Sequence, residues 1–200
     1  MKMGKKIMIS SLSFLILYGG FYLYNVTAEP KTVYVKTKYI STESVEELES
    51  EAELIVKATK ISENNEVSKL TDSGDSSISY EEPFTIGTFS IDKIYFDKTS
   101  QYKNEDEFQL KEFSGYTINK LTGVKTYIAP EDYQATEVGK SYLLFVRESM
   151  SDPGRYIIFA HHYGKYGIDS EDSMEIANKL DDKTSSKYKK IEKEIKEKYK

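Results

Sequence analysis

Alternating apolar and polar positions recur along the chain after residue 30 and predict a β-rich domain. The expected strands, in chain order, are 32–40, 54–61, 84–96, 107–113, 125–130, 141–148 and 155–162. The last two carry continuous apolar runs, as central strands do. The sequence SDPG at 151–154 has the composition of a turn, so 141–162 is expected to form a hairpin.

The expected strand 84–96 carries apolar residues in a pattern that one regular strand cannot place on a single face. These residues are Phe84, Ile86, Phe89, Ile91, Ile94 and Phe96. Because side chains alternate between the two faces, we expect two β-bulges, one near Gly87 and one near Asp92 and Lys93. Bulges bend and coil a strand, so this pattern favours a closed or strongly curled antiparallel barrel.

A short amphipathic helix is expected just before the strand at 54–61. Ser44 and Glu47 have the spacing of a capping box. The apolar residues that follow on one helical face are Val45, Leu48 and Ala52. Further along, the polar residues 62–83 predict a hairpin connection or a long loop.

Residues 171–200 predict a charged C-terminal helix that begins near Asp172 and carries Ile176, Ala177 and Leu180 on one side. The later apolar positions form a narrow stripe of Tyr188, Ile191, Ile195 and Tyr199. So little apolar surface predicts a solvated, partly frayed helix. The alternative is a helix whose stripe binds a partner helix or an anionic surface.

The uncharged run 7–26 follows three N-terminal lysines. A run of this length can span a bilayer as a helix, and the lysines predict that the N-terminus lies on the inner side. A signal peptide cleaved after Ala28 is the alternative, because the strongly apolar part is short and small residues precede that position. Both interpretations place residues 29–200 on the extracytoplasmic side of a membrane.

The composition narrows the functional classes. The formal net charge of −5 argues against a nucleic-acid-binding protein, which needs a basic footprint. The chain has no cysteine, which excludes disulfides, thiol nucleophiles and cysteine-ligated metals. Only Arg147 and Arg155 among the 28 basic residues are arginines, so fork-type recognition of carboxylate or phosphate is limited to them.

Gly139-Lys140-Ser141 matches the end of a nucleotide-binding P-loop. The glycine required five residues earlier is absent, because Gln134 occupies that position. An apolar strand pattern follows Ser141, whereas a P-loop opens a helix whose N-terminus faces the phosphates. We therefore expect a turn that leads into a core strand, and no nucleotide site.

The best polar and aromatic cluster of the sequence lies near the end of the last expected strand, and its residues are the candidate binding residues: His161, His162, Tyr163, Tyr166 and Arg155. Adjacent histidines on a strand point to opposite faces, so the pair cannot chelate one metal unless the strand has ended. Either histidine has the side chain of an acid or base near neutral pH. The sequence shows no other catalytic constellation, no metal motif and no cofactor motif.

Four segments together resemble a group of small exported domains of Gram-positive bacteria. They read SVEELESEAELIVKATKI, FSIDKIYF, EVGKSYLLFV and YIIFAHHYGKYGID. The resemblance covers about residues 43–169 and carries no catalytic motif. It implies a small barrel related in shape to oligonucleotide/oligosaccharide-binding (OB) folds, without an assigned activity.

These observations predict an α+β fold, a curled, OB-like antiparallel barrel with one short amphipathic helix. The expected division is a signal anchor or signal peptide over 1–28, an extracytoplasmic barrel over 29–170 and the charged helix over 171–200. The expected function is a non-enzymatic cell-surface module that binds a protein or an envelope polymer. The alternative is a hydrolase acting on envelope material through His161 or His162 with a carboxylate.

Overall fold

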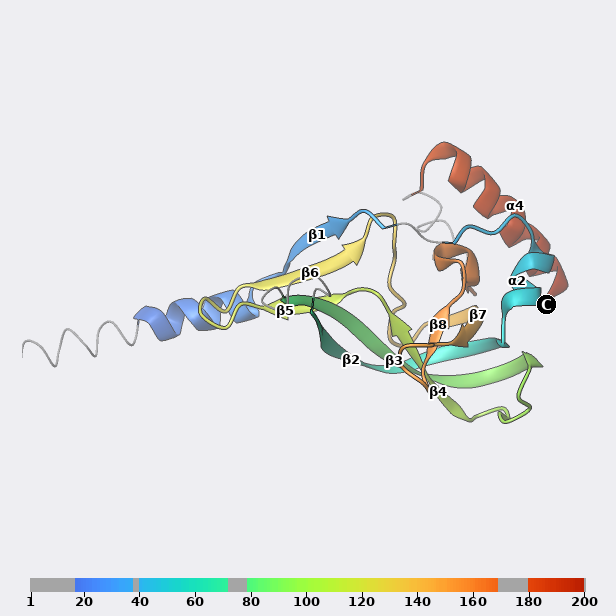
Figure 1. Ribbon diagram of the computed structural model, residues 1–200, viewed down its shortest axis with the longest axis horizontal. Coiled ribbons are helices and arrows are strands. Elements are labelled where there is room, and N and C mark those ends of the chain that lie inside the picture. The colour runs from blue at the N-terminus through green and yellow to red at the C-terminus, as the bar shows by residue number, and fades with distance from the viewer. Residues whose placement is uncertain (1–16, 38–39, 72–78, 169–179, 200) are drawn as a thin grey trace, which may run out of the picture.

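The computed structural model describes residues 17–37, 40–71, 79–168 and 180–199. Within these ranges, five strands close into a barrel. In their order around it they are β2 (Leu54–Thr71), β3 (Ser79–Asp97), β4 (Glu107–Glu112), β8 (Tyr156–Ile158) and β7 (Ser141–Glu148), and β7 pairs with β2 again. Helices pack outside this barrel (Figure 1), so the predicted α+β barrel is confirmed.

One pair of barrel strands departs from the predicted antiparallel arrangement. β4 and β8 are parallel, whereas the other neighbours around the barrel are antiparallel. The reason is geometric, because directions that alternate from strand to strand cannot close a ring of five. The prediction of a wholly antiparallel barrel is therefore wrong at this one seam.

The hairpin of β2 and β3 carries the bulges that bend the barrel. Two extra residues in β3, Asp92 and Tyr95, and one in β2, Ile61, interrupt the pairing. The slip expected near Asp92 and Lys93 is therefore confirmed. Each extra residue increases the local twist, which helps a strand of this length to curl around the interior.

The bulge expected in β3 near Gly87 is wrong. β3 pairs with β4 without interruption from Thr85 to Ser90, and the nearest bulge lies in the partner strand at Ile61. The apolar residues change parity here because both faces of β3 are covered. Residues 83–87 are all buried, and β5 (Gly115–Ile118) lies against β2 and β3.

Of the two predictions for the polar stretch 62–83, the hairpin connection is confirmed, because β2 and β3 pair antiparallel, and the long loop is wrong, because most of the stretch is strand. Residues 62–71 continue β2 and residues 79–83 begin β3, while 72–78 lie outside the described residues. Polar residues are tolerated because this part of the hairpin extends past the barrel, and its backbone groups pair across the two strands. Side-chain polarity alone therefore misplaces the strand ends.

A second, smaller sheet lies beside the extended hairpin. It consists of β1 (Lys31–Val35), β6 (Lys125–Pro130) and β5, with β1 parallel and β5 antiparallel to β6. β6 has the predicted bounds, β1 ends earlier than the predicted 32–40, and β5 is not predicted. Figure 1 shows this sheet pointing toward the N-terminal end of the molecule.

Two apolar clusters share the strand β7. Its residues Tyr142, Leu144 and Val146 face the barrel interior, while Leu143 and Phe145 face the helices outside. The continuous apolar run of β7 is thus explained by burial on both faces, as predicted. The hairpin of β7 and β8 is also confirmed.

Helices α2 (Val45–Glu51) and α4 (Asp182–Lys198) cover the outer cluster. The Ser44 half of the predicted capping box is confirmed, because the Ser44 hydroxyl accepts a hydrogen bond from the Glu47 amide at 3.3 Å. The Glu47 carboxylate accepts instead from the Glu43 amide at 2.7 Å, one residue before the position that a capping box requires.

The predicted solvated C-terminal helix is wrong for α4. The side chains of Tyr188, Ile191 and Ile195 are buried in the outer cluster, because the outward face of β7 needs an apolar cover. The predicted helix start at Asp172, with Ile176 and Ala177, lies outside the described residues.

Residues 17–27 are helical and lie at the far end of the molecule from α2 (Figure 1). In the described part of the chain, no helix combines the length and apolar character that crossing a bilayer requires. Residues 7–16 of the predicted apolar run lie outside the described residues.

Candidate functional site

The predicted strand 155–162 is wrong beyond Ile158, where β8 ends. Ala160 and His161 have φ angles of 54° and 57°, which turn the chain into the 3₁₀ helix η1 (His161–Gly164). Gly164 allows the turn to pack tightly, because a Cβ atom there would lie 2.1 Å from the carbonyl oxygen of Phe159. β9 (Lys165–Gly167) then runs back along β7.

The structure gathers four of the five candidate binding residues around η1 and β9, and places them mainly in the core. His162, Tyr163 and Tyr166 are only 1–2% exposed, and His161 is half-buried. The Tyr166 ring stacks on Tyr188 of α4 with centroids 5.3 Å apart. These aromatic side chains therefore mainly pack the outer cluster, and of the candidate residues Tyr166 also lines a pocket of about 360 Å³ beside Tyr95 and Tyr199.

The two histidines have strongly lowered pKa values. Burial, the neighbouring His162 and the Lys165 ammonium lower the pKa of His161 to about 3. Burial and Lys165 likewise lower the pKa of His162 to about 4. Both imidazoles are thus neutral at neutral pH, because a positive charge is unfavourable in an apolar site beside a cation.

Arg155, the fifth candidate, lies apart from the histidines. Its guanidinium pairs with both carboxylate oxygens of Glu66, each at 3.0 Å, and with Asp152 at 2.9 Å. The Glu66 hydrogen bond is the main reason why the pKa of Arg155 is raised. The donor fork of this arginine is therefore occupied by the chain itself.

A buried ionic network forms at Glu112, at the end of β4. The Glu112 carboxylate lies 3.4 Å from Lys60 Nζ and 3.8 Å from Lys165 Nζ. It also accepts hydrogen bonds from the Tyr133 hydroxyl and from the amide and hydroxyl of Thr136. Burial alone would raise the pKa of Glu112, but both lysines and these hydrogen bonds outweigh it and hold that pKa below its usual value.

This network is closed to solvent. Lys60, Glu112 and Lys165 are each at most 1% exposed. Lys60 also donates to the Glu63 carboxylate at 2.7 Å and to the Thr136 carbonyl at 2.8 Å. Every charge is thus met by groups of the chain itself, which is the arrangement expected of a structural element.

The turn at Gly139-Lys140-Ser141 has the predicted role. Gly139 has a φ of 87°, its amide donates to the Lys60 carbonyl at 2.8 Å, and β7 begins at Ser141. A strand, not a helix, follows this turn, as expected from the apolar residues after it.

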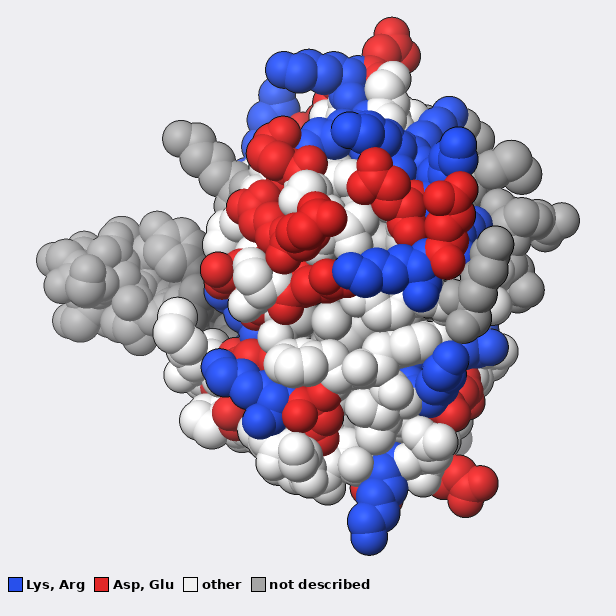
Figure 2. Space-filling view, turned by 90° about the vertical axis from the view of Figure 1, so that its right-hand side faces the viewer, with Lys and Arg blue, Asp and Glu red and all other residues white. Residues whose placement is uncertain are grey.

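An open pocket of about 520 Å³ lies at the end of the barrel between α2 and the ends of β3 and β7. Its lining includes Glu49, Glu51, Ala52, Glu53, Phe96, Lys98, Arg147, Glu148 and Met150. Figure 2 shows this end of the molecule, where charged side chains crowd the upper part and an uncharged strip crosses below them. We call this site the Arg147 pocket.

Several charged groups of the Arg147 pocket are already paired. Glu53 accepts from Lys98 at 3.0 Å and from the Glu148 amide at 2.8 Å. These two bonds are the main reasons why the pKa of the Glu53 carboxyl lies below its usual value. Glu49 binds Lys198 of α4 at 2.6 Å. These pairs hold the walls of the pocket in place.

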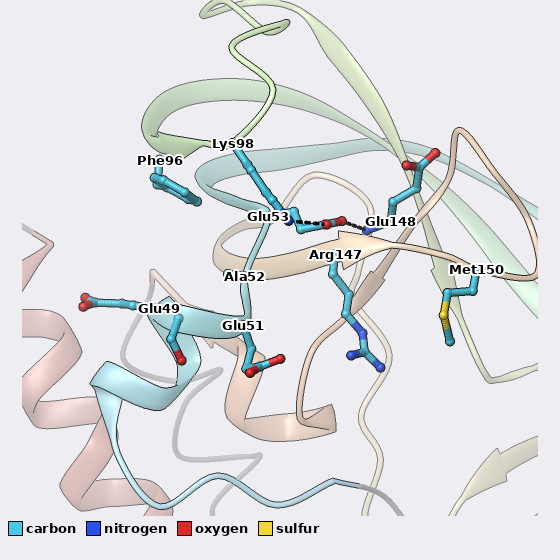
Figure 3. A pocket seen from close by; sticks show the side chains of 10 residues that line it. Glu49, Glu51, Ala52, Glu53, Phe96, Lys98, Arg147, Glu148 and Met150 are labelled. Atoms are coloured by element: carbon cyan, nitrogen blue, oxygen red, sulfur yellow. Dashed lines mark hydrogen bonds and ion pairs between the residues drawn. The ribbon is translucent and has the colours of Figure 1, made fainter.

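Two charged side chains of the pocket are not paired. In the described part of the chain, the side chains of Arg147 and Glu51 form no hydrogen bond and no ion pair. The Arg147 guanidinium lies over the Phe159 ring at 5.2 Å, and its charge contributes to the lowered pKa of Glu53. Figure 3 shows Arg147 descending from β7 with Glu51 on one side and Met150 on the other. Met150 is 96% exposed, so its side chain lacks apolar contacts.

The pocket continues into a shallow hollow lined by aromatic residues. This second hollow shares Glu49 and Phe96 with the Arg147 pocket and adds Tyr95 and Tyr199. The rings of Tyr95 and Tyr199 meet edge to face with centroids 4.9 Å apart. A ligand longer than the first pocket would therefore extend over a rigid aromatic floor.

Sequence reasoning does not locate this pocket, because its walls come from α2, β3 and β7, which are distant along the chain. The one available signal is the scarcity of arginine, which singles out Arg147 and Arg155. Only the structure distinguishes them, since Arg155 is engaged by Glu66 and Arg147 is not.

In the ranges that the structure describes, no group of three or more His, Asp or Glu side chains is placed to hold a metal ion. Neither protein-family models nor curated proteins show a match to this sequence. The resemblance of residues 43–169 to small exported domains therefore stays a prediction, and the candidate site is defined by its geometry.

Proposed function

We propose that this protein is a non-enzymatic binding module, anchored in a membrane through residues 7–26, with its barrel on the extracytoplasmic side. The observation that carries the binding role is the half-buried guanidinium of Arg147, which has no ion-pair partner among the described residues. A guanidinium presents a planar fork of donors that matches a carboxylate. Its place in an open pocket makes that fork available to a ligand.

The ligand should carry both charges. Four carboxylates and two cations line the Arg147 pocket, so a purely anionic ligand would be repelled. Glu51 can accept from an ammonium group of the same ligand that gives a carboxylate to Arg147. Phe96 and Met150 offer contact to apolar atoms between them. A short peptide segment of a protein or an envelope polymer that carries one free carboxylate and one free ammonium group has this chemistry.

The barrel topology supports a binding role. β8 lies between β4 and β7, so the five strands follow an order related to that of OB folds, and we assign the barrel to this class. In such folds the loop between the fourth and fifth strands contributes to ligand binding. Here that loop, between β7 and β8, carries Met150 at the pocket rim. Fold alone does not determine the ligand.

The hydrolase alternative has weaker support. The side chain of His162 is buried, and the pKa values of His161 and His162, about 3 and 4, are far below the pH at which a general base is most effective. Neither histidine lines the Arg147 pocket or the aromatic hollow beside it. We therefore propose binding without catalysis.

Calorimetric titration of the full chain in detergent micelles tests this proposal. The probe is the tripeptide Ala-Leu-Ala with free ends, and the same peptide amidated, acetylated, or blocked at both ends. We expect amidation to weaken binding by at least about tenfold, because one charged hydrogen-bonded contact contributes about 1.5–3 kcal/mol. The Arg147→Ala variant should no longer distinguish the free peptide from the amidated one.

Arg155→Ala is the matched control, because it removes the other arginine, which lies outside the pocket. It should bind the free peptide like the unaltered protein. Equal affinity for all four peptides, the absence of binding, or an equal loss in both arginine variants would overturn the proposal.

A further inference from the structure

The helical residues 17–27 are tied to the tip of the β5–β6 hairpin. The Tyr18 hydroxyl donates to the carbonyl of Leu121, and the Asn25 side-chain amide donates to the carbonyl of Thr122 at 2.8 Å. Both acceptors lie in the turn between β5 and β6. Segments that are about 100 residues apart in sequence therefore lie side by side, as Figure 1 also shows.

The turn has a fixed shape that permits this close contact. The Asn119 side chain accepts from the amides of Leu121 and Thr122, both at 3.0 Å. Gly123 has a φ of 72°, and a Cβ atom there would lie 2.8 Å from the carbonyl oxygen of Tyr22. Only glycine fits this position without strain, so the helix and the turn form one unit.

This unit exposes apolar side chains from both of its parts, and none of them is more than two-thirds covered. They are Leu17 (73% exposed), Phe21 (55%), Leu23 (65%), Tyr24 (71%), Ile118 (47%), Leu121 (72%) and Val124 (39%). Exposed apolar side chains gathered in this way mark an interaction surface, because water contact with so much apolar area is unfavourable.

The charges around the surface favour an anionic lipid interface as the partner. Residues 113–130 contain Lys120 and Lys125 and no acidic residue, in a chain with 33 acidic residues. Tyrosines such as Tyr18 and Tyr24 are typical of the boundary between lipid and water. The helix itself is the C-terminal part of the uncharged run 7–26, the proposed anchor, so the hairpin tip is tied directly to the anchor.

We propose that the tip of the β5–β6 hairpin, residues 118–125, enters the lipid interface beside the anchor and fixes the orientation of the barrel on the membrane. This inference rests on the membrane anchoring proposed above and adds a second contact to it. The elements that line the Arg147 pocket, α2 and the ends of β3 and β7, lie at the opposite end of the long axis of the molecule (Figure 1). The pocket would therefore face away from the lipid, toward whatever lies outside the membrane.

The absence of cysteine allows a direct test with single labels. A nitroxide is attached to Leu121→Cys or, as the matched control, to Met150→Cys in the full chain, reconstituted in vesicles of phosphatidylcholine and phosphatidylglycerol. Both side chains are strongly exposed, so the substitutions leave the core intact. We expect the label at 121 to lose most of its contact with an aqueous nickel reagent and to gain contact with oxygen, and the label at 150 to show the reverse.

A second pair of variants tests the mechanism. Lys120→Glu with Lys125→Glu should leave the chain bound to the vesicles but return the label at 121 to water. Vesicle-bound protein whose label at 121 is as accessible to nickel as the label at 150 overturns this inference alone. Protein that does not sediment with the vesicles overturns the anchoring proposal and this inference together. A label at 121 that is hidden from both reagents indicates a protein contact and also overturns the inference.

Discussion

The Glu112 network and the Arg147 pocket use the same kinds of charged side chains in opposite ways. Glu112 is enclosed, and two lysines, a tyrosine and a threonine satisfy its carboxylate. Arg147 stands at an open pocket and has no ion-pair partner among the described residues. The comparison teaches that the pairing of a charge, more than its residue type, separates a structural charge from one available to a ligand.

The largest expected effect is a loss of stability when the enclosed Glu112 network is disrupted. Glu112→Gln keeps the shape of the side chain but removes the buried counter-charge that Lys60 and Lys165 share, while Lys60 keeps its pair with Glu63. We expect the free energy of unfolding to fall by about 3–5 kcal/mol, as for other buried pairs that lose one partner. Urea denaturation followed by circular dichroism measures this change.

Glu51→Gln in the Arg147 pocket is the matched control, because Glu51 is exposed and unpaired among the described residues. It should change the free energy of unfolding by less than about 0.5 kcal/mol. Equal losses of stability in the two variants would show that the charge of Glu112 contributes no more to stability than the charge of Glu51.

The next effect concerns peptide binding at the open Arg147 pocket. Arg147→Ala should weaken binding of the free tripeptide by about 1.5–3 kcal/mol, the value of a charged hydrogen-bonded contact. Its free energy of unfolding should fall by no more than about 1 kcal/mol, because the contact of the guanidinium with the Phe159 ring is lost but no side-chain hydrogen bond within the described chain is. A variant that unfolds more easily and binds normally would place Arg147 among the structural charges.

A further effect on stability should follow pH. The lowered pKa values of His161 and His162 mean that unfolding takes up protons, so stability falls as the pH drops below about 6.5 toward 4. Glu112 acts in the same direction at lower pH: its folded pKa is below the usual value, so its contribution is present above about 4.5 and is lost as the pH falls through the folded pKa.

Thermal melts between pH 7.5 and 4 measure this dependence. The melting temperature of the His162→Gln variant should fall less between pH 6.5 and 4.5 than that of the unaltered protein. Each 1 kcal/mol of pH-dependent stability that the substitution removes corresponds to roughly 2–4 °C in melting temperature. Identical curves for the variant and the unaltered protein would mean that His162 is not held neutral by the fold.

The smallest effect is expected at Arg155. Its pairs with Glu66 and Asp152 lie near the surface, where such pairs contribute about 0–1 kcal/mol to stability. Arg155→Ala should therefore lower the unfolding free energy slightly in urea denaturation and leave peptide binding unchanged. Substitution of Arg155 should then change only the stability, whereas substitution of Arg147 should change mainly the affinity for the peptide.

The fold was predictable where local pattern and burial agree. β6 and β7 have their predicted bounds because their apolar residues are followed by clear turn residues. β5 was not predictable, since Gly115 and Tyr116 show no alternation and the strand is stabilised by pairing with β6. The burial of the apolar stripe of α4 was also not predictable. It depends on the outward face of β7, and the sequence of the helix alone does not show that this face packs against it.

The site was less predictable than the fold. The sequence predicted a binding cluster that includes His162, Tyr163 and Tyr166. A sequence alone does not distinguish aromatic side chains that pack in a core from those that contact a ligand. The Arg147 pocket is assembled from segments that are distant in sequence. The pairing of Arg155 with Glu66 depends on two strands that only the closed barrel brings together.

The closure of the barrel has a consequence for how the chain acquires its structure. β2 pairs with β7, so Leu54 meets Val146, and the parallel seam joins Leu110 to Tyr156. Contacts between such distant residues are formed slowly, because a long segment must first be brought together. Because the chain is synthesised from its N-terminus, the β2–β3 hairpin keeps its apolar side chains exposed until residues 141–158 have been made. Protection from aggregation during that interval is then a requirement of its biogenesis.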